Sequence, residues 1–279
     1  MAIFNKVVIF GTGLIGGSLG LALKRKHLAK QVIGLSRLKK NAELAIEIGA
    51  IDQIGTSLRV VQDADLVILA TPVDLIMEIA LKIAKSLKKD CIVIDVGSTK
   101  EKIVSRLSTL IPNFVGCHPL AGSEKKGILN ARENIFTGSI CIITPLAKTK
   151  KNTLNKIKSL WAKLGTQVIM LTPARHDQIL AFTSHLPHTI AFSLIGSIPD
   201  KFLVLSSSGL KDATRISGSD ALLWSEIFLS NRKNLLFAVS SFQQKLTALK
   251  LALKNKDTQR LTKILSAAKE KRERLMKAQ

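Results

Sequence analysis

Histidine is the side chain best suited to move a proton near neutral pH, and this sequence of 279 residues holds five. His118 stands out because it lies in GCHPLAGSE, where an apolar, strand-like run gives way to glycine and serine. The carboxyl ends of strands are where open α/β sheets carry their ligands. We therefore interpret His118 as a candidate general acid–base group, with Pro119 stiffening the turn after it.

Two further histidines, His185 and His188, lie three residues apart in TSHLPHTIAF. Pro187 between them favours a helix start rather than a helix interior. No cysteine or carboxylate completes a metal-ligand set at this spacing, so we expect no metal. Anion binding by one of the pair is the interpretation we favour.

Arg215 is a lone arginine among small and apolar residues in LKDATRIS. A guanidinium in such surroundings needs an anionic partner, and a planar carboxylate suits it. Asp212, three residues earlier, would give a structural ion pair on one helical face. We favour a substrate carboxylate as the partner, with Asp212 in an orienting role.

A glycine-rich loop, GTGLIGGS, follows the apolar run VVIF near the N-terminus. Its glycines Gly11, Gly13 and Gly16 have the GxGxxG spacing of a dinucleotide-binding turn that opens a helix at Leu14 and Ile15. Such a helix start offers unpaired N–H groups to a pyrophosphate. The strand before the loop and the helix after it make this signal specific.

The second strand ends in GLSR, which puts Ser36 and Arg37 where NAD-binding proteins usually carry an acidic residue. A hydroxyl and a guanidinium would hold a 2′-phosphate that a carboxylate would repel. We therefore expect a preference for NADP, with NAD possible as well. Thr71 and Pro72 in ATPVD, and Ser98 in DVGSTK, follow the next two strands and are expected to line the cofactor groove, with Ser98 beside the nicotinamide.

Short runs rich in valine and isoleucine alternate with amphipathic segments through the first part of the chain. This alternation predicts βαβ units and a parallel, doubly wound Rossmann-type sheet. The expected strands are 6–10, 31–35, 66–70, 91–96, 113–116, 140–144 and 168–171, and expected helical segments include 18–26, 75–87 and 151–164.

After Thr172 the strand rhythm stops, and long helix-compatible stretches follow at 177–195, 221–252 and 258–276. We expect a nucleotide-binding domain at 1–172 and an all-helical domain at 173–279. The apolar surface of the second domain predicts a homodimer.

The formal net charge of +22 comes mostly from lysines spread along the chain, without an arginine-rich arm, so we expect no nucleic-acid partner. A positive field would still attract an anionic substrate and cofactor. Three cysteines without a CxxC pair indicate buried free thiols in a reducing, cytoplasmic compartment. We expect neither a membrane span nor a leader peptide.

The motifs GTGLIGGS, ATPVD, DVGSTK, GCHPLAGSE, SHLPH and DATRI occur in this order along the chain. In them the sequence resembles the prephenate/arogenate dehydrogenase family. That resemblance implies an NAD(P)-dependent oxidative decarboxylation of prephenate or arogenate, and a helical domain that forms a dimer. It leaves the choice between the two substrates open.

The resemblance also implies roles for single residues. By motif, His118 would take the proton of the ring hydroxyl, with Ser98 as its partner beside the nicotinamide. His188 and His185 would be substrate-site residues, and Arg215 would clamp a substrate carboxylate. Glu124 and Asp212 would be gating or orienting groups.

Two alternatives stay open at this point. One is another two-domain NADP-dependent dehydrogenase, of the β-hydroxyacid dehydrogenase or imine reductase type. Enzymes of the β-hydroxyacid group typically carry a Lys-x-x-x-Asn pair in the helical domain. No such pair follows Thr172 in this sequence. The other is a non-enzymatic NADP-binding protein, which would have no need of His118, Ser98 and Arg215 together.

Overall fold

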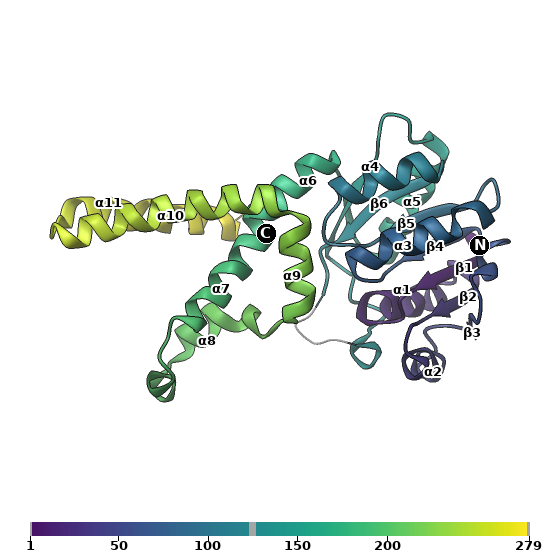
Figure 1. The fold of residues 1–279 in the computed structure, drawn as a ribbon, viewed down its shortest axis with the longest axis horizontal. Coiled ribbons are helices and arrows are strands. Elements are labelled where there is room, and N and C mark those ends of the chain that lie inside the picture. Colours follow the sequence, from purple (N-terminus) through teal and green to yellow (C-terminus); the bar gives the residue numbers. More distant parts are fainter. Residues whose placement is uncertain (1, 123–126, 278–279) are drawn as a thin grey trace. The chain divides into compact units, whose positions relative to one another are not determined.

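The computed structural model of the chain describes residues 2–122 and 127–277 (Figure 1). Its first part contains one eight-stranded sheet with the strand order β3-β2-β1-β4-β5-β6-β7-β8. The strands are β1 (Phe4–Phe10), β2 (Ala29–Leu35), β3 (Gln53–Ile54), β4 (Leu66–Leu69), β5 (Ile92–Asp95), β6 (Phe114–Pro119), β7 (Ile140–Thr144) and β8 (Gln167–Met170).

Helices cover both faces of this sheet, so the sheet is doubly wound as predicted (Figure 1). Alternate residues of β1 enter two separate cores: Val7 and Ile9 face one, Val8 and Phe10 the other. The first core is filled from α1 (Leu14–Arg25) and α5 (Lys151–Leu164), the second from α3 (Val73–Ile83) and α4 (Glu101–Leu110). Burial on both faces explains why these strands are continuously apolar.

The expectation of a wholly parallel sheet is wrong in one place. Strands β1 to β6 pair in parallel, but β7 pairs antiparallel to β6, with His118 opposite Ile142. The apolar run ICIIT carries no mark of its direction, so the sequence pattern could not reveal the reversal. The two-residue strand β3 was also missed, and β6 extends beyond the predicted 113–116 to include His118.

Shorter elements complete this part of the chain. They are α2 (Lys39–Glu47) and single turns of 3₁₀-helix at Leu58–Val61, Ala84–Ser86 and Ile128–Asn130. Cys91, Cys117 and Cys141 are buried free thiols, as predicted.

The rest of the described chain is helical. Its elements are α6 (Pro173–Leu180), a π-helical turn (Ala181–His185), α7 (Leu186–Gly196), a 3₁₀ segment (Asp200–Leu205), α8 (Ser208–Thr214), a second 3₁₀ turn (Arg215–Gly218), α9 (Ala221–Ser230), α10 (Arg232–Lys254) and α11 (Thr258–Lys277). The helix-compatible stretch 221–252 is helical but forms two helices, because the first one ends before Asn231. Pro187 lies in the first turn of α7, but a π-helical turn precedes it rather than a loop.

By contacts, the described chain divides into two compact units, residues 1–232 and 233–279. The first contains the sheet and the helices through α9, and the second contains nearly all of α10 and all of α11. Within the first unit, the helical stretch Pro173–Gly196 is long and apolar enough to span a membrane by length and composition alone. A core or interface helix passes the same test, and this stretch also carries His176, Asp177 and His185, all buried.

Candidate active site

The glycine-rich loop between β1 and α1 is tightly packed at two of its glycines and open at the third. Gly11 has a φ of +93°, and a Cβ there would lie 2.5 Å from the carbonyl oxygen of Ala70. A Cβ on Gly16 would lie 1.9 Å from the oxygen of Gly11, so this helix can approach the strand only with glycine there. Around Gly13, in contrast, the space is open within 4 Å, and no side chain caps the start of α1. The open space at Gly13, beside the uncapped start of α1, would accommodate a phosphate.

Two more predicted cofactor residues follow β2. Ser36 is half-buried directly after the strand, and Arg37 is exposed beside it. After β4, the hydroxyl oxygen of Thr71 is buried and has no hydrogen-bond partner within the described residues. A buried hydroxyl without a partner costs free energy unless a ligand supplies one. Thr71 therefore fits the wall of a dinucleotide groove that starts at the glycine loop.

A cavity of about 560 Å³ lies at the carboxyl edge of the sheet. Five of the predicted residues line it together: Ser98, His118, His185, His188 and Arg215. They come from the loop after β5, from β6, from the π-helical turn, from α7 and from the 3₁₀ turn after α8. The cavity is also lined by Trp224 and Asp220, which sequence reasoning did not single out.

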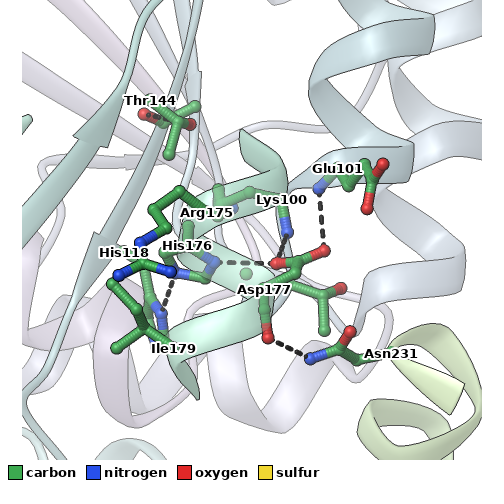
Figure 2. A network of polar contacts seen from close by, with 12 residues as sticks. Lys100, Glu101, His118, Thr144, Arg175, His176, Asp177, Ile179 and Asn231 are labelled. Carbon is green, nitrogen blue, oxygen red and sulfur yellow. Dashed lines mark hydrogen bonds and ion pairs between the residues drawn. The ribbon is translucent and has the colours of Figure 1, made fainter. Parts of the chain in front are cut away.

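Beneath His118 lies a chain of hydrogen bonds that reaches into the interior (Figure 2). Nδ1 of His118 lies 2.8 Å from Nε2 of His176, and Nδ1 of His176 lies 2.7 Å from Oδ1 of Asp177. The Asp177 carboxylate also accepts the backbone N–H groups of Lys100 and Glu101, at 2.7 and 2.9 Å. These N–H groups begin α4 and have no partner inside the helix, so Asp177 caps that helix from α6.

Asn231 connects this network to the other side of the cavity. Its side-chain amide donates to the carbonyl oxygen of Asp177, at 2.7 Å, and to Nδ1 of His185, at 3.1 Å. His185 therefore accepts at Nδ1 and carries its proton on Nε2. Such an arrangement makes His185 a hydrogen-bond donor toward the cavity.

His188 is held differently. Its Nδ1 donates to the carbonyl oxygen of Ser184, at 2.9 Å, which leaves Nε2 as an acceptor. Its ring stacks on Trp224, with centroids 3.4 Å apart and planes inclined by 20°. The stack fixes the orientation of the imidazole on the cavity wall.

The cavity histidines are neutral at pH 7. Burial, followed by the neighbouring His176 and Lys100, lowers the pKa of His118 well below its ordinary value of 6.5. Burial lowers the pKa of His185 to about 4, and it also lowers the pKa values of His176 and His188. A neutral imidazole has a lone pair, so His118 can accept a proton without first losing one.

A buried ion pair lies close to this network. Nζ of Lys100 bonds to Oδ2 of Asp95, and both side chains are fully buried. Burial raises the pKa of Asp95 above its ordinary value of 3.8, and Lys100 opposes this shift. The positive charge of Lys100 is one reason why His118 and His176 have lowered pKa values.

Two predicted site residues are not among the described residues that line the cavity. Asp212 is exposed and is not among the residues that line the cavity. Glu124 lies outside the residues that the structure describes. Arg215 lines the cavity but is exposed, so the expectation that its neighbours shield it from water is wrong. Within the described ranges, no group of three or more His, Cys, Asp or Glu side chains could hold a metal ion.

Sequence reasoning missed His176, Asp177, Trp224 and Asn231. The adjacent ionisable pair His176–Asp177, at the start of a strongly apolar helical stretch, was the one available signal. The roles of Trp224 and Asn231 depend on contacts with residues 36 and 46 positions away, at His188 and His185, which no local pattern reveals.

A mostly parallel sheet with a glycine-rich first turn, and a cavity lined by neutral histidines at the edge of that sheet, define a nucleotide-dependent oxidoreductase. Comparisons with known proteins narrow this class. The family model described as the prephenate dehydrogenase nucleotide-binding domain matches residues 19–170, and the model for the prephenate dehydrogenase dimerization domain matches residues 172–267. The chain belongs to the prephenate dehydrogenase family, and the resemblance inferred from the six motifs is confirmed.

Individual relatives are similar over nearly the whole chain. A prephenate dehydrogenase of Bacillus subtilis is 31% identical, over 97% of this chain and 76% of its own length. The crystal structure of prephenate dehydrogenase from A. aeolicus, in complex with hydroxyphenyl propionate and NAD+, has a TM-score of 0.89 at 34% identity and covers 97% of this chain and 98% of its own. A Synechocystis arogenate dehydrogenase has a TM-score of 0.84 at 32% identity, over 97% of this chain and 99% of its own.

Proposed function

We propose that this chain oxidises and decarboxylates prephenate or arogenate, transferring a hydride to NAD(P)+ and yielding 4-hydroxyphenylpyruvate or tyrosine. One observation carries the assignment of the site: Ser98, His118, His185, His188 and Arg215 line a single cavity at the carboxyl edge of the sheet. Family membership decides against the β-hydroxyacid dehydrogenase, imine reductase and non-enzymatic alternatives.

In the proposed mechanism, His118 is the base. Its neutral imidazole accepts the proton of the ring hydroxyl, while Ser98 on the neighbouring loop orients that hydroxyl. Hydride acceptance is the chemistry that a bound dinucleotide supplies. As the hydroxyl-bearing carbon is oxidised, the ring carboxylate leaves as carbon dioxide, and its bonding electron pair completes the aromatic ring. The ring oxygen then takes a proton back from His118, which gives the phenol of the product.

The remaining cavity residues bind and orient. Arg215 holds a substrate carboxylate by charge-assisted hydrogen bonds, His185 donates from Nε2, and His188 accepts at Nε2. We retain Glu124 and Asp212 as proposed gating or orienting groups on the strength of their motifs alone. Because aromatisation drives the reaction, positioning and exclusion of water are what these residues must contribute.

We propose NADP as the preferred cofactor, on the basis of Ser36 and Arg37 after β2. Gly11, Gly13, Leu14, Ile15 and Gly16 would surround the pyrophosphate, and Thr71, Pro72 and Ser98 would line the groove. Ser36 and Arg37 would contact the 2′-phosphate. The double variant Ser36→Asp with Arg37→Leu should shift the ratio of kcat/KM for NADP over NAD by at least about tenfold toward NAD, since it exchanges a charge-assisted bond for repulsion.

Initial rates with prephenate and arogenate, each with NAD and NADP, measure this shift and the substrate preference together. Arg106→Leu, an exposed arginine on α4, is the matched control and should leave the ratio unchanged. If the double variant keeps the wild-type ratio of kcat/KM for NADP over NAD, residues other than Ser36 and Arg37 recognise the 2′-phosphate.

We further propose a homodimer formed through residues 173–279, the range that we assign to a helical substrate and dimer domain. Large apolar side chains are exposed there in the single chain, among them Val204 at 85%, Leu222 at 70% and Leu229 at 71%. Light scattering at micromolar concentration should give twice the mass of one chain, because water contact with such a surface is unfavourable. A stable monomer would contradict the proposal. Cytoplasmic location, and the lack of nucleic-acid and membrane partners, remain predictions.

A further inference from the structure

The hydrogen-bond chain beneath His118 leads to an inference that rests on the proposed role of His118 as base. An imidazole acts as a base only at the nitrogen that carries no proton, so the enzyme must control which of the two nitrogens of His118 is protonated. His118 lines the cavity, and its Nδ1 is already engaged by His176 below. The nitrogen available to a substrate is therefore Nε2.

The buried end of this hydrogen-bond chain, at Asp177, decides which atom donates and which accepts in each of its bonds. Asp177 is 3% exposed, and its two carboxylate oxygens meet three N–H groups: those of Lys100, Glu101 and the ring of His176. Two of these donors are backbone groups, which cannot reverse their role. A carboxylate surrounded in this way acts as an acceptor throughout, so Nδ1 of His176 must carry a proton.

From this fixed point the proton positions follow along the chain. A neutral His176 with its proton on Nδ1 presents a lone pair at Nε2. Across the 2.8 Å contact, Nδ1 of His118 must then be the donor. His118 is left with its lone pair on Nε2, toward the cavity.

We propose that His176 and Asp177 are positioning residues that hold His118 in its Nδ1–H tautomer, with Nε2 ready to accept the proton of the substrate. Burial makes this arrangement strict, because His176 is fully buried and water cannot replace a lost partner. The lowered pKa of His176, caused first by burial, keeps that ring neutral at pH 7, as the tautomer argument requires.

The base and its two positioning residues come from different domains of the chain. His118 belongs to the residues matched by the nucleotide-binding domain model, whereas His176 and Asp177 belong to those matched by the dimerization domain model. Asp177 also caps α4, and Asn231 in turn holds the carbonyl oxygen of Asp177. The helical half thus sets the tautomer of a base that the sheet provides.

A purely structural role is the competing explanation, in which Asp177 caps α4 and His176 fills space. The two explanations differ in what they predict for His176→Gln and His176→Leu. Glutamine can place its side-chain oxygen near the position of Nε2 and accept from His118, whereas leucine of similar volume cannot. Both variants remove the hydrogen bond that Nδ1 of His176 donates to Oδ1 of Asp177.

The experiment compares the full-length wild type with both variants by ¹⁵N NMR of labelled histidine, steady-state kinetics and thermal unfolding. In the wild type, we expect His118 and His176 both to carry the proton on Nδ1. In His176→Leu, the His118 proton should move toward Nε2 and kcat should fall by about tenfold or more, with KM within about twofold. His176→Gln should recover most of kcat and the Nδ1–H signature. His27→Gln, an exposed histidine, controls for the assignment of the resonances.

A wild-type His118 protonated on Nε2 would overturn the proposal even if neither variant folds. Equal losses of kcat in the two variants, tracking their loss of thermal stability, would also overturn it in favour of the structural explanation. Failure of the proposed function looks different: His118→Asn would then retain turnover, while the wild-type tautomer would still be Nδ1–H.

Discussion

Replacement of His118 by asparagine should lower kcat by about 10²- to 10⁴-fold, the range expected for the loss of a positioned acid–base group. Asparagine can place its amide nitrogen near the position of Nδ1 and still donate to His176, so the buried network beneath the site should persist. What the variant lacks is the Nε2 lone pair toward the cavity. Stopped-flow or steady-state assays with saturating substrate and cofactor measure the effect.

The pH profile gives a second measurement of the same residue. Because burial lowers the pKa of His118 well below 6.5, the base stays unprotonated as the pH falls from 7 to 6, and kcat/KM should hold over that interval. It should decrease only at lower pH, as the pH approaches the lowered pKa and His118 becomes protonated. His27→Asn serves as the control for a histidine outside the site. Near wild-type turnover in His118→Asn would remove His118 from the mechanism.

Replacement of Arg215 by alanine should raise KM by about 10- to 150-fold, which corresponds to about 1.5–3 kcal/mol for hydrogen bonds to a charged group. Arg215 lies in the 3₁₀ turn after α8, exposed and on the wall of the cavity. The proposed role requires the exposed guanidinium to bind the substrate carboxylate when the substrate enters the cavity. The affinity for dinucleotide and the thermal unfolding temperature should hardly change.

Arg175→Ala is the matched control for this prediction. Arg175 is also exposed, and its guanidinium donates to Gln178 at 2.7 Å on α6. Its loss should leave KM as it is. A destabilised Arg215→Ala with unaltered KM would instead identify Arg215 as a structural residue.

The helices and strands were predictable wherever burial requires a regular pattern of apolar residues in the sequence. Strands buried on both faces must be continuously apolar, and α5 (Lys151–Leu164) was predicted to the residue because its apolar positions recur at helical spacing. The direction of β7 was not predictable, since an apolar run reads alike in either direction. The break at Asn231 was missed for another reason: the polar contacts that occupy its side chain are with Asp177 and His185, far away in the sequence.

For the site, motifs located the residues that face the cavity but not those that support them. His118 lies near the end of β6, Ser98 in the loop after β5 and Arg215 in a 3₁₀ turn, all within motifs that are visible in the sequence. The partners of Asp177 are backbone N–H groups at Lys100 and Glu101, which every residue possesses. A contact made to the backbone leaves no signature in residue type, so the support beneath His118 could be found only from the fold.

The π-helical turn at Ala181–His185 places one extra residue in the wall of the cavity. A π turn holds one residue more than the α-helical turn that it replaces, and an α-helix rotates by about 100° per residue. The turn absorbs this extra residue locally, so deleting one residue there would restore regular α-helix while α7 keeps nearly the same face, with His188 against Trp224. His176 and Asp177, which precede the turn, would keep their places. A single-residue insertion or deletion in this turn would therefore change the cavity wall at Thr183, Ser184 and His185, and leave the His176–Asp177 support of His118 unchanged.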